Sequence, residues 1–271
     1  MENEQAKTKI VVIGGTGLIG SKVVKKLNDD GYQAVAAAPN TGVNTLTGEG
    51  LAEVLEGASV VVDVSNSPSL DGSAAMDFFT KSTGNLLKYE EAAGVKHHVA
   101  LSVVGSDRLA EGGYMQAKLE QEKMIKESPV PYTIVHATQF FEFVKGIADS
   151  GTQGDTVHLA PVLFQPIAAD DVAEAVAKVA TETPVNGMVE VAGPEIFRFD
   201  ELVAKGIKAR NDPRKVVADP DALYFGSHLS EKTLIAGEGA RLAHTKFDEW
   251  IADPKNQPQQ QDSKPRTTAA G

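Results

Sequence analysis

The chain has 271 residues, 42% of them hydrophobic and 23% charged, a composition typical of a globular protein and unlike that of a fibre or a disordered chain. Its formal net charge of −11 argues against a nucleic-acid partner, because an acidic surface repels a phosphate backbone. The absence of cysteine excludes disulfides, thiolate metal sites and cysteine nucleophiles. The six histidines are scattered apart from the adjacent His97 and His98, so no metal site is expected.

The amino end resembles neither a signal peptide nor a membrane anchor. The polar stretch MENEQAKTK is followed by only a short apolar run, and no run in the chain reaches about 18 apolar residues. We therefore expect a cytoplasmic protein without a membrane partner.

Strand and helix patterns alternate through the first half of the chain. Buried strands are predicted at 9–13, 32–38, 58–64, 97–104 and 130–136. Amphipathic helices are predicted between them at 18–31, 50–57, 73–94 and in the stretch that contains GGYMQAKLEQE. Repeated strand-helix-strand units predict an α/β fold, a doubly wound parallel sheet of the Rossmann type.

The second half is less regular. Helices are expected at 139–150, 170–180 and 199–210, and a strand at 187–193. We predict one domain over residues 1–252, with a small C-terminal substrate-binding lobe built mainly from 137–252. Residues 253–271 are rich in proline, glutamine and small polar side chains, so they are expected to form a flexible tail.

The strongest local pattern is the glycine-rich stretch that follows the first strand. It reads both as G-x-G-x-x-G and as G-x-x-G-x-x-G, it comes after a buried strand, and it opens an amphipathic helix. Backbone amides and the positive end of the helix can hold a pyrophosphate there. The predicted cofactor-binding residues of this turn are Gly14, Gly15, Thr16, Gly17, Leu18, Ile19 and Gly20.

The residues that would distinguish NAD from NADP are uncharged. An acidic residue about 20 positions after the glycines would hold the ribose of NAD, and an arginine would favour NADP, but residues 32–48 carry no charge. Asn40 and Thr41 could hydrogen-bond the ribose or its phosphate, or form a plain polar turn. Because no carboxylate repels the extra phosphate, the sequence slightly favours NADP(H) over NAD(H).

Four motifs in order, GGTGLIG, LSVVG, YMQAK and PIAADDVAEAV, resemble those of atypical short-chain dehydrogenases/reductases of the NmrA-like or extended kind, over roughly residues 8–250. The resemblance implies that Tyr114 is a general acid or base, that Lys118 lowers its pKa and also contacts the nicotinamide ribose, and that Ser102 orients the substrate. Ser106 is the alternative orienting serine. Asn85 resembles the asparagine of a proton relay, although a structural role is the stronger interpretation.

The pairing of Tyr114 with Lys118 also makes chemical sense without the resemblance. A tyrosine with a pKa near 10 needs a neighbouring cation to exchange protons at neutral pH, and residues four apart share a helix face. The alternative is an ordinary exposed turn in which Lys118 pairs with Glu122.

Further candidates follow the strands at 58–64 and 130–136. Ser65 is expected to border the cofactor, and Thr138 and Gln139 to approach the nicotinamide. Three aromatic residues could wall an apolar substrate pocket or form plain core: Phe140, Phe141 and Phe143.

These observations predict an NAD(P)-dependent oxidoreductase that moves a hydride between a nicotinamide and a small carbonyl or alcohol substrate. Two alternatives stay open. One is a dehydratase, epimerase or isomerase of the same superfamily, and the other is an NmrA-like protein that senses the NADPH/NADP ratio.

Overall fold

A seven-stranded sheet forms the centre of the structure, a computed structural model that describes residues 7–109 and 113–256. The strand order is β12-β9-β5-β4-β3-β1-β2, and every neighbouring pair is parallel. The predicted doubly wound parallel sheet is thereby confirmed. The strands are β1 (Lys9–Ile13), β2 (Gln33–Ala37), β3 (Val60–Asp63), β4 (His97–Val103), β5 (Tyr132–Ala137), β9 (Gly187–Ala192) and β12 (Arg241–Leu242).

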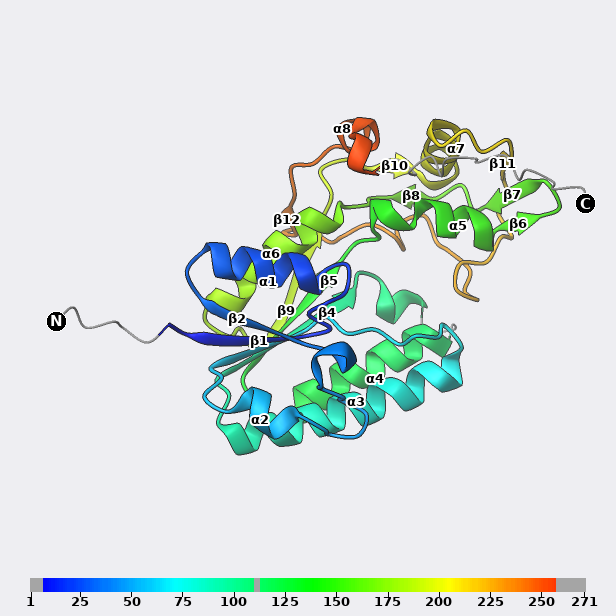
Figure 1. The fold of residues 1–271 in the computed structure, drawn as a ribbon. Coiled ribbons are helices and arrows are strands. Elements are labelled where there is room, and N and C mark those ends of the chain that lie inside the picture. The colour runs from blue at the N-terminus through cyan, green and yellow to red at the C-terminus, as the bar shows by residue number, and fades with distance from the viewer. Residues whose placement is uncertain (1–6, 110–112, 257–271) are drawn as a thin grey trace, which may run out of the picture.

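Helices cover both faces of the sheet (Figure 1). α1 (Gly20–Asp29) and α6 (Ala169–Thr181) pack on one face, while α2 (Leu51–Leu55), α3 (Gly72–Ala93) and α4 (Gly113–Glu127) cover the other. β1 is buried on both faces, as its run of β-branched residues predicts. The longest helix, α3, begins where the Asp71 carboxylate accepts from the Ala74 amide and ends at Gly94, whose φ of 70° is left-handed.

The chain changes its direction of winding at β1. β1 pairs with β2 on one side and with β3 on the other, so the helices that follow β1 and β3 lie on opposite faces. In open parallel sheets, ligands bind in the crevice outside the carboxyl ends of the strands at such a point. The topology therefore places a binding crevice beside the glycine-rich turn that follows β1.

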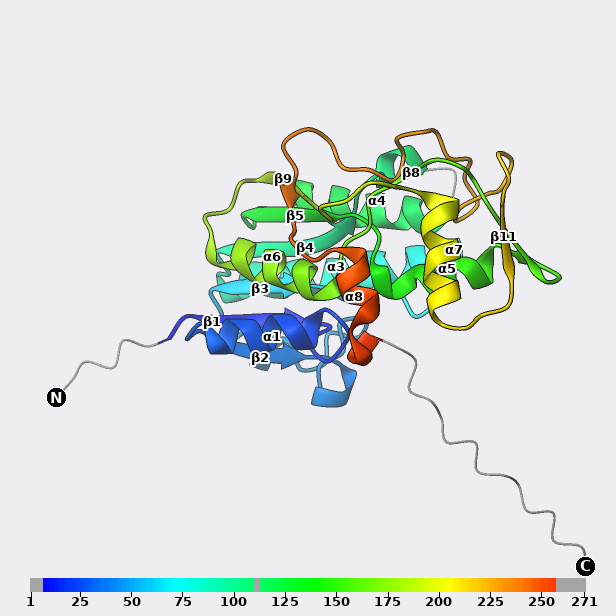
Figure 2. The same cartoon turned by 90° about the horizontal axis from the view of Figure 1, so that it is seen from above.

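The remaining elements form a lobe beyond the carboxyl ends of the strands (Figures 1 and 2). α6, β9 and β12 return to the large sheet, although they lie within 137–252. The helices of the lobe are α5 (Val144–Ser150), α7 (Phe199–Ala209) and α8 (Phe247–Ala252). Its short strands are β6 (Thr152–Gln153), β7 (Thr156–Leu159), β8 (Leu163–Phe164), β10 (Phe197–Arg198) and β11 (Lys215–Ala218).

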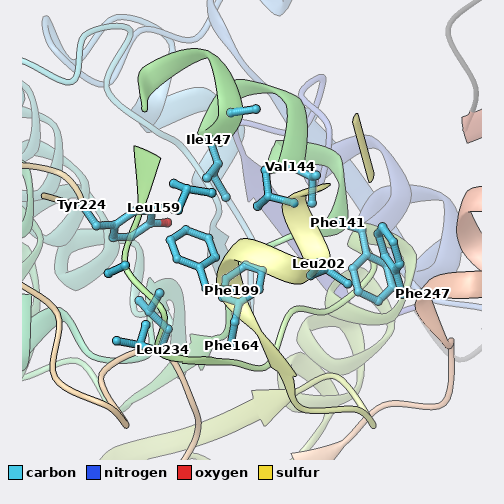
Figure 3. Packing of buried hydrophobic residues seen from close by; sticks show 14 of the residues in the cluster. Phe141, Val144, Ile147, Leu159, Phe164, Phe199, Leu202, Tyr224, Leu234 and Phe247 are labelled. Carbon is cyan, nitrogen blue, oxygen red and sulfur yellow. The ribbon is translucent and has the colours of Figure 1, made fainter. Parts of the chain in front are cut away.

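Aromatic side chains make up much of the lobe's core (Figure 3). The rings of Phe164 and Phe199 lie 4.7 Å apart between centroids, and Phe199 meets Tyr224 edge-on at 5.6 Å. Tyr224 is 5% exposed, and within the described residues its hydroxyl has no hydrogen-bond partner. Burial raises the pKa of Tyr224 well above its usual range.

The second half of the chain departs most from the sequence-based expectations. The helix expected at 139–150 is a 3-10 turn, Phe141–Phe143, followed by α5. At the start of the expected tail, Pro254–Asn256 form another 3-10 turn, and 257–271 lie outside the described residues. Within residues 7–109 and 113–256, no helix combines the length and apolar character needed to cross a bilayer.

Removing the unpaired hydroxyl of Tyr224 should not lower the stability of the fold. Tyr224→Phe is expected to leave the free energy of unfolding unchanged or to raise it by up to about 1–2 kcal/mol, because the desolvation penalty of an unpaired buried hydroxyl disappears. The matched control is Ser227→Ala, which removes a buried hydrogen bond of 3.0 Å to the Leu109 carbonyl and should lower stability by about 1 kcal/mol. Urea denaturation of both variants checks the contrast, and a clear loss in Tyr224→Phe would contradict it.

Candidate active site

The glycine-rich turn is held by close backbone contacts. Gly14 has a φ of +74°, and a Cβ on it would lie 2.9 Å from the Ser65 amide nitrogen. A Cβ on Gly20 would lie 2.1 Å from the Gly14 carbonyl oxygen, and one on Gly15 would lie 2.7 Å from the Ala36 Cα in β2. Gly17 differs, because a Cβ there would meet only the Gly14 carbonyl, at 3.3 Å. Gly17 therefore leaves room on the open side of the turn, where a phosphate could approach.

A cavity of about 640 Å³ opens at this turn and extends along the carboxyl ends of the strands to Phe140 and Phe143, just before α5. Six residues of the turn line it: Gly14, Thr16, Gly17, Leu18, Ile19 and Gly20. Gly15 instead faces β2 and serves packing. The cavity also reaches Ser65, Ser102, Tyr114, Lys118 and Thr138. The structure thus gathers the predicted residues from five separate segments of the chain around one space.

Asn40 lies at the edge of this arrangement, in the 3-10 turn Pro39–Thr41 after β2. The Thr16 hydroxyl donates a hydrogen bond of 3.1 Å to the Asn40 Oδ1. Thr41 is occupied differently, because its Oγ1 accepts from the Ala38 amide at 2.9 Å. Asn40 is therefore tied to the glycine-rich turn, while Thr41 caps its own turn.

Tyr114 enters the cavity from the first turn of α4. Its hydroxyl donates a hydrogen bond of 2.7 Å to the Asn66 Oδ1, in the loop after β3. Its ring lies against Phe79 at 6.2 Å. Burial raises the pKa of Tyr114 to about 12, only partly offset by the bond to Asn66. Sequence reasoning did not identify Asn66, which lies next to the expected Ser65.

Lys118 lies on the same helix, but no hydrogen bond joins it to Tyr114 among the described residues. Its Nζ donates to the Leu101 carbonyl at 3.0 Å and to the Gln121 Oε1 at 2.5 Å, and it lies 4.6 Å from the centroid of the Phe79 ring. Burial lowers the pKa of Lys118 to about 8, against the opposing attraction of Asp63 and Glu122. The expected lowering of the tyrosine pKa by Lys118 is therefore absent from this structure, because the ammonium points elsewhere.

The Ser102 side chain is hydrogen-bonded to a buried carboxylate. Its hydroxyl donates a hydrogen bond of 2.7 Å to the Glu122 Oε1, and His136 Nε2 lies 2.9 Å from the same oxygen. Ser106 approaches it at 3.4 Å. Burial alone would raise the pKa of Glu122, but the nearby His136 and the hydrogen bonds from Ser102 and Lys126 outweigh burial and hold the pKa at about 2. Both candidate serines thus share one ionised partner.

Polar atoms without partners remain on the β5 side of the cavity. Thr138 Oγ1 and Gln139 Nε2 are buried and have no hydrogen-bond partner within the described residues, and both residues line the cavity. Because buried polar groups are normally hydrogen-bonded, these atoms are suited to bind a polar ligand. The chemistry of this wall fits the carboxamide of a nicotinamide.

The three candidate aromatic residues separate into two groups. Phe140 and Phe143 line the cavity and stack on each other at 5.1 Å between ring centroids. Phe141 is buried in the lobe's core against Phe247 and Trp250. The expectation of a pocket wall therefore suits the first two residues, and the alternative of plain core suits Phe141.

Asn85 contacts the loop that precedes α2. Its Nδ2 donates to the Thr45 carbonyl at 2.8 Å and to the Leu46 carbonyl at 3.0 Å. These bonds fit the structural interpretation of Asn85, since they hold a loop that lines the cavity.

One group of potential metal ligands lies at a second pocket, of about 330 Å³. Side-chain atoms of Asp171, Glu174 and His244 come within 4.8 Å of one another. Both carboxylate oxygens of Asp171 already accept hydrogen bonds from Thr245, and the His244 side chain is largely exposed. Acidic groups on a surface commonly gather in this way without an ion.

Comparisons with known proteins point to the same kind of ligand. A family model described as NAD(P)H-binding matches residues 14–183. The chain is 23% identical over 215 residues to the photosystem II assembly factor Ycf39 of Synechocystis, covering 72% of this chain and 65% of that protein. It is 27% identical over 226 residues to the chloroplastic divinyl chlorophyllide a 8-vinyl-reductase of Cucumis sativus, covering 69% and 53%. The chain spans about half to two thirds of the length of the curated relatives it matches.

A solved structure extends the likeness over most of the chain. A dTDP-4-dehydrorhamnose reductase from Clostridium acetobutylicum superimposes with a TM-score of 0.63 at 19% identity, covering 87% of this chain and 95% of that one. At this identity the similarity concerns the fold alone.

The depressed pKa of Lys118 has a measurable effect on stability. A group whose pKa is lower in the folded state than in the unfolded state destabilises the fold at low pH, and this penalty fades as the pH rises toward the unfolded value. The free energy of unfolding of the wild type should therefore rise relative to that of Lys118→Met between pH 7.5 and 9.5, by about 1–2 kcal/mol. Urea denaturation at several pH values measures the difference, and parallel curves would contradict a buried lysine with this pKa.

Proposed function

The chain belongs to the NAD(P)H-binding family, and from that membership we propose that it is an NAD(P)-dependent oxidoreductase that reduces a carbonyl group of a small molecule. One observation carries the proposal: the glycine-rich turn and the side chain of Tyr114 open onto the same cavity. A dinucleotide held at the turn can then have its reactive ring beside a proton donor.

The residues around the cavity fit such a cofactor. The turn from Gly14 to Gly20 would hold the pyrophosphate, with the free space at Gly17 admitting it. Asn40 would bind the adenosine ribose, Ser65 would border the cofactor, and the unpaired Thr138 hydroxyl would bind the nicotinamide end. Lys118 would contact the nicotinamide ribose. When bound, the cofactor supplies the hydride, and the protein's own groups supply position and the proton.

Proton transfer would fall to Tyr114. A phenol with an ordinary pKa near 10 is already protonated at neutral pH, and burial, which raises the pKa of Tyr114 to about 12, keeps it in the form that can donate a proton. An alkoxide formed from a carbonyl is a stronger base than a phenolate, so transfer of the phenolic proton to the substrate oxygen is favourable. The protonation state therefore supports reduction of a carbonyl over oxidation of an alcohol. Asn66, which accepts from the hydroxyl, would position it.

Ser102 remains part of the proposal as the residue that orients the substrate. Its hydroxyl donates to Glu122 in this structure, so it would have to rotate toward the cavity or accept a hydrogen bond where it stands. Because Glu122 is ionised and also partnered by His136 and Lys126, it can lose the serine bond without being left unpaired.

Removing the phenolic hydroxyl tests the proton donor. Tyr114→Phe is expected to lower kcat/KM by about 10² to 10⁴, while the dissociation constant for NADPH changes by less than about twofold. The matched control is Tyr132→Phe, at the amino end of β5 and away from the cavity. A carbonyl panel with cofactor consumption as readout measures turnover. Full activity of Tyr114→Phe would refute the role, and dinucleotide binding without turnover by the wild type would favour the sensor alternative.

Cofactor preference tests the role of Asn40. We propose a slight preference for NADP(H), since the described residues of the cavity include no carboxylate to repel its extra phosphate. Asn40→Asp preserves an acceptor for Thr16 but adds a charge, so the dissociation constant for NADPH should rise at least about tenfold while that for NADH is unchanged or falls. Asn186→Asp adds the same charge away from the cavity and should alter neither. Calorimetric titration of the wild type and both variants with each cofactor measures the six constants, and equal effects of Asn40→Asp on both cofactors would contradict the placement.

A further inference from the structure

A two-residue turn in the lobe holds a phenylalanine in a left-handed conformation. Tyr224 and Ser227 exchange two backbone hydrogen bonds of 2.9 and 3.1 Å, which close a tight hairpin turn around Phe225 and Gly226. The φ angles of these two residues are 49° and 81°. Positive φ at both central positions defines a turn that strongly prefers asparagine, aspartate or glycine.

A phenylalanine at this position strains the backbone. A bulky residue with positive φ is a genuine conformational outlier, and such strain persists chiefly where the surrounding structure and a function require it. Glycine or asparagine would close the same turn without that strain. The aromatic ring, and not the turn, therefore needs an explanation.

The ring of Phe225 lies beside the proposed proton donor. Its centroid is 6.2 Å from that of Tyr114, and the two planes are inclined by 27°. It meets Tyr224 edge-on at 4.6 Å. Phe225 is nevertheless 37% exposed, so its two ring contacts do not cover it completely. An incompletely covered aromatic residue thus lies next to the phenol that would carry the proton.

Several contacts hold the turn in this position. Tyr224 is buried in the lobe's core, and the Ser227 hydroxyl donates to the Leu109 carbonyl just before α4. Arg108 donates to the Lys232 and Ile235 carbonyls, at 2.9 and 3.3 Å. The segment that carries Phe225 is therefore fastened to the loop between β4 and α4, and its ring keeps its place relative to Tyr114.

The walls of the cavity limit the chemistry of the substrate; Phe225 is not one of them but packs against Tyr114, which is. Among the described residues that line the cavity, Lys118 is the only charged one, and its ammonium is held by Leu101 and Gln121. Phe78, Phe140 and Phe143 also line the cavity. Apart from the glycine-rich turn proposed for the cofactor, a phosphate or carboxylate group of a substrate would find no free cation on these walls, whereas a flat apolar ring would find faces on which to stack.

We propose that Phe225 contacts the substrate and selects a flat, uncharged aromatic carbonyl compound, whose ring stacks on it while the carbonyl oxygen lies near the Tyr114 hydroxyl. The inference rests on the proposed reductase function for its kinetic test, and on binding alone for a second test. The strained turn would then hold the ring of Phe225 where the substrate can contact it.

The kinetic test compares two aldehydes of different shape. Phe225→Gly and Phe225→Asn both remove the aromatic ring and introduce a residue that adopts positive φ readily. Both variants should therefore have an unchanged or higher Tm. The ratio of kcat/KM for 2-naphthaldehyde to that for hexanal should fall at least about tenfold in both variants, mainly through KM. Leu223→Ala removes another exposed apolar side chain from the same segment and should leave the ratio unchanged.

A binding test separates this inference from the reductase proposal. Calorimetry with 2-naphthol and protein saturated with NADP should show binding to the wild type that is weakened at least about tenfold in Phe225→Gly. That result supports the aromatic site even when neither aldehyde is turned over. An unchanged aldehyde ratio, absence of 2-naphthol binding to the wild type, or a fall in Tm with equal losses for both aldehydes would overturn the assignment.

Discussion

The close approach of three backbone segments around the glycine-rich turn sets the geometry of the whole site. A side chain at Gly20 would overlap the Gly14 carbonyl, and one at Gly14 would overlap the Ser65 amide. The end of β1, the start of α1 and the loop after β3 are therefore pinned to one another. Because β1 lies between β2 and β3, this contact stands at the point where the chain changes its direction of winding. The cavity opens at that point because the helices diverge from it onto opposite faces of the sheet.

A chain of buried polar contacts connects the loop after β3 to the helix that carries Tyr114. The Ser65 hydroxyl donates to Asp63 at 2.6 Å, and Gln121 donates to the other oxygen of the same carboxylate at 3.1 Å. Gln121 in turn accepts from Lys118. The lysine charge is thus stabilised by a carboxylate through an intervening amide, and the glycine-rich turn and α4 are joined by the same residues. This arrangement explains why the ammonium is held by Gln121 and the Leu101 carbonyl. It also fixes the height at which α4 presents Tyr114 to the cavity, since Lys118 is one helical turn further along.

Local patterns in the sequence were sufficient to predict the sheet and the turn. The β-branched runs locate β1, β3, β4 and β5 within about two residues of their ends, and the glycine spacing identifies the tight turn between β1 and α1. Contacts between distant segments could not be predicted in this way. The acceptor for Tyr114 is Asn66, 48 positions away, and it becomes one only because the loop after β3 folds toward α4. Phe225 lies in a stretch without helical or strand periodicity, so nothing in the pattern indicated that it would meet Tyr114. The direction of the tyrosine pKa shift depends on where the ammonium of Lys118 points, which spacing on a helix does not determine.

Burial connects the electrostatics of the site to the direction of its chemistry. The same burial raises the pKa of Tyr114 and lowers that of Lys118, because poor solvation disfavours the charged form of each group, the phenolate and the ammonium. A neutral phenol is the form that donates a proton, whereas oxidation of an alcohol would require the phenolate that burial opposes. An enzyme does not change the overall equilibrium. The protonation state of Tyr114 before the substrate binds would nevertheless decide whether the site is ready for a carbonyl, which needs a proton donor, or for an alcohol, which needs a base. A bound oxidised cofactor would bring a positive charge close to the phenol and lower its pKa again. In the proposed reaction, a preference for reduction would therefore be strongest with the reduced, uncharged nicotinamide bound, which is the state in which a carbonyl substrate would be met.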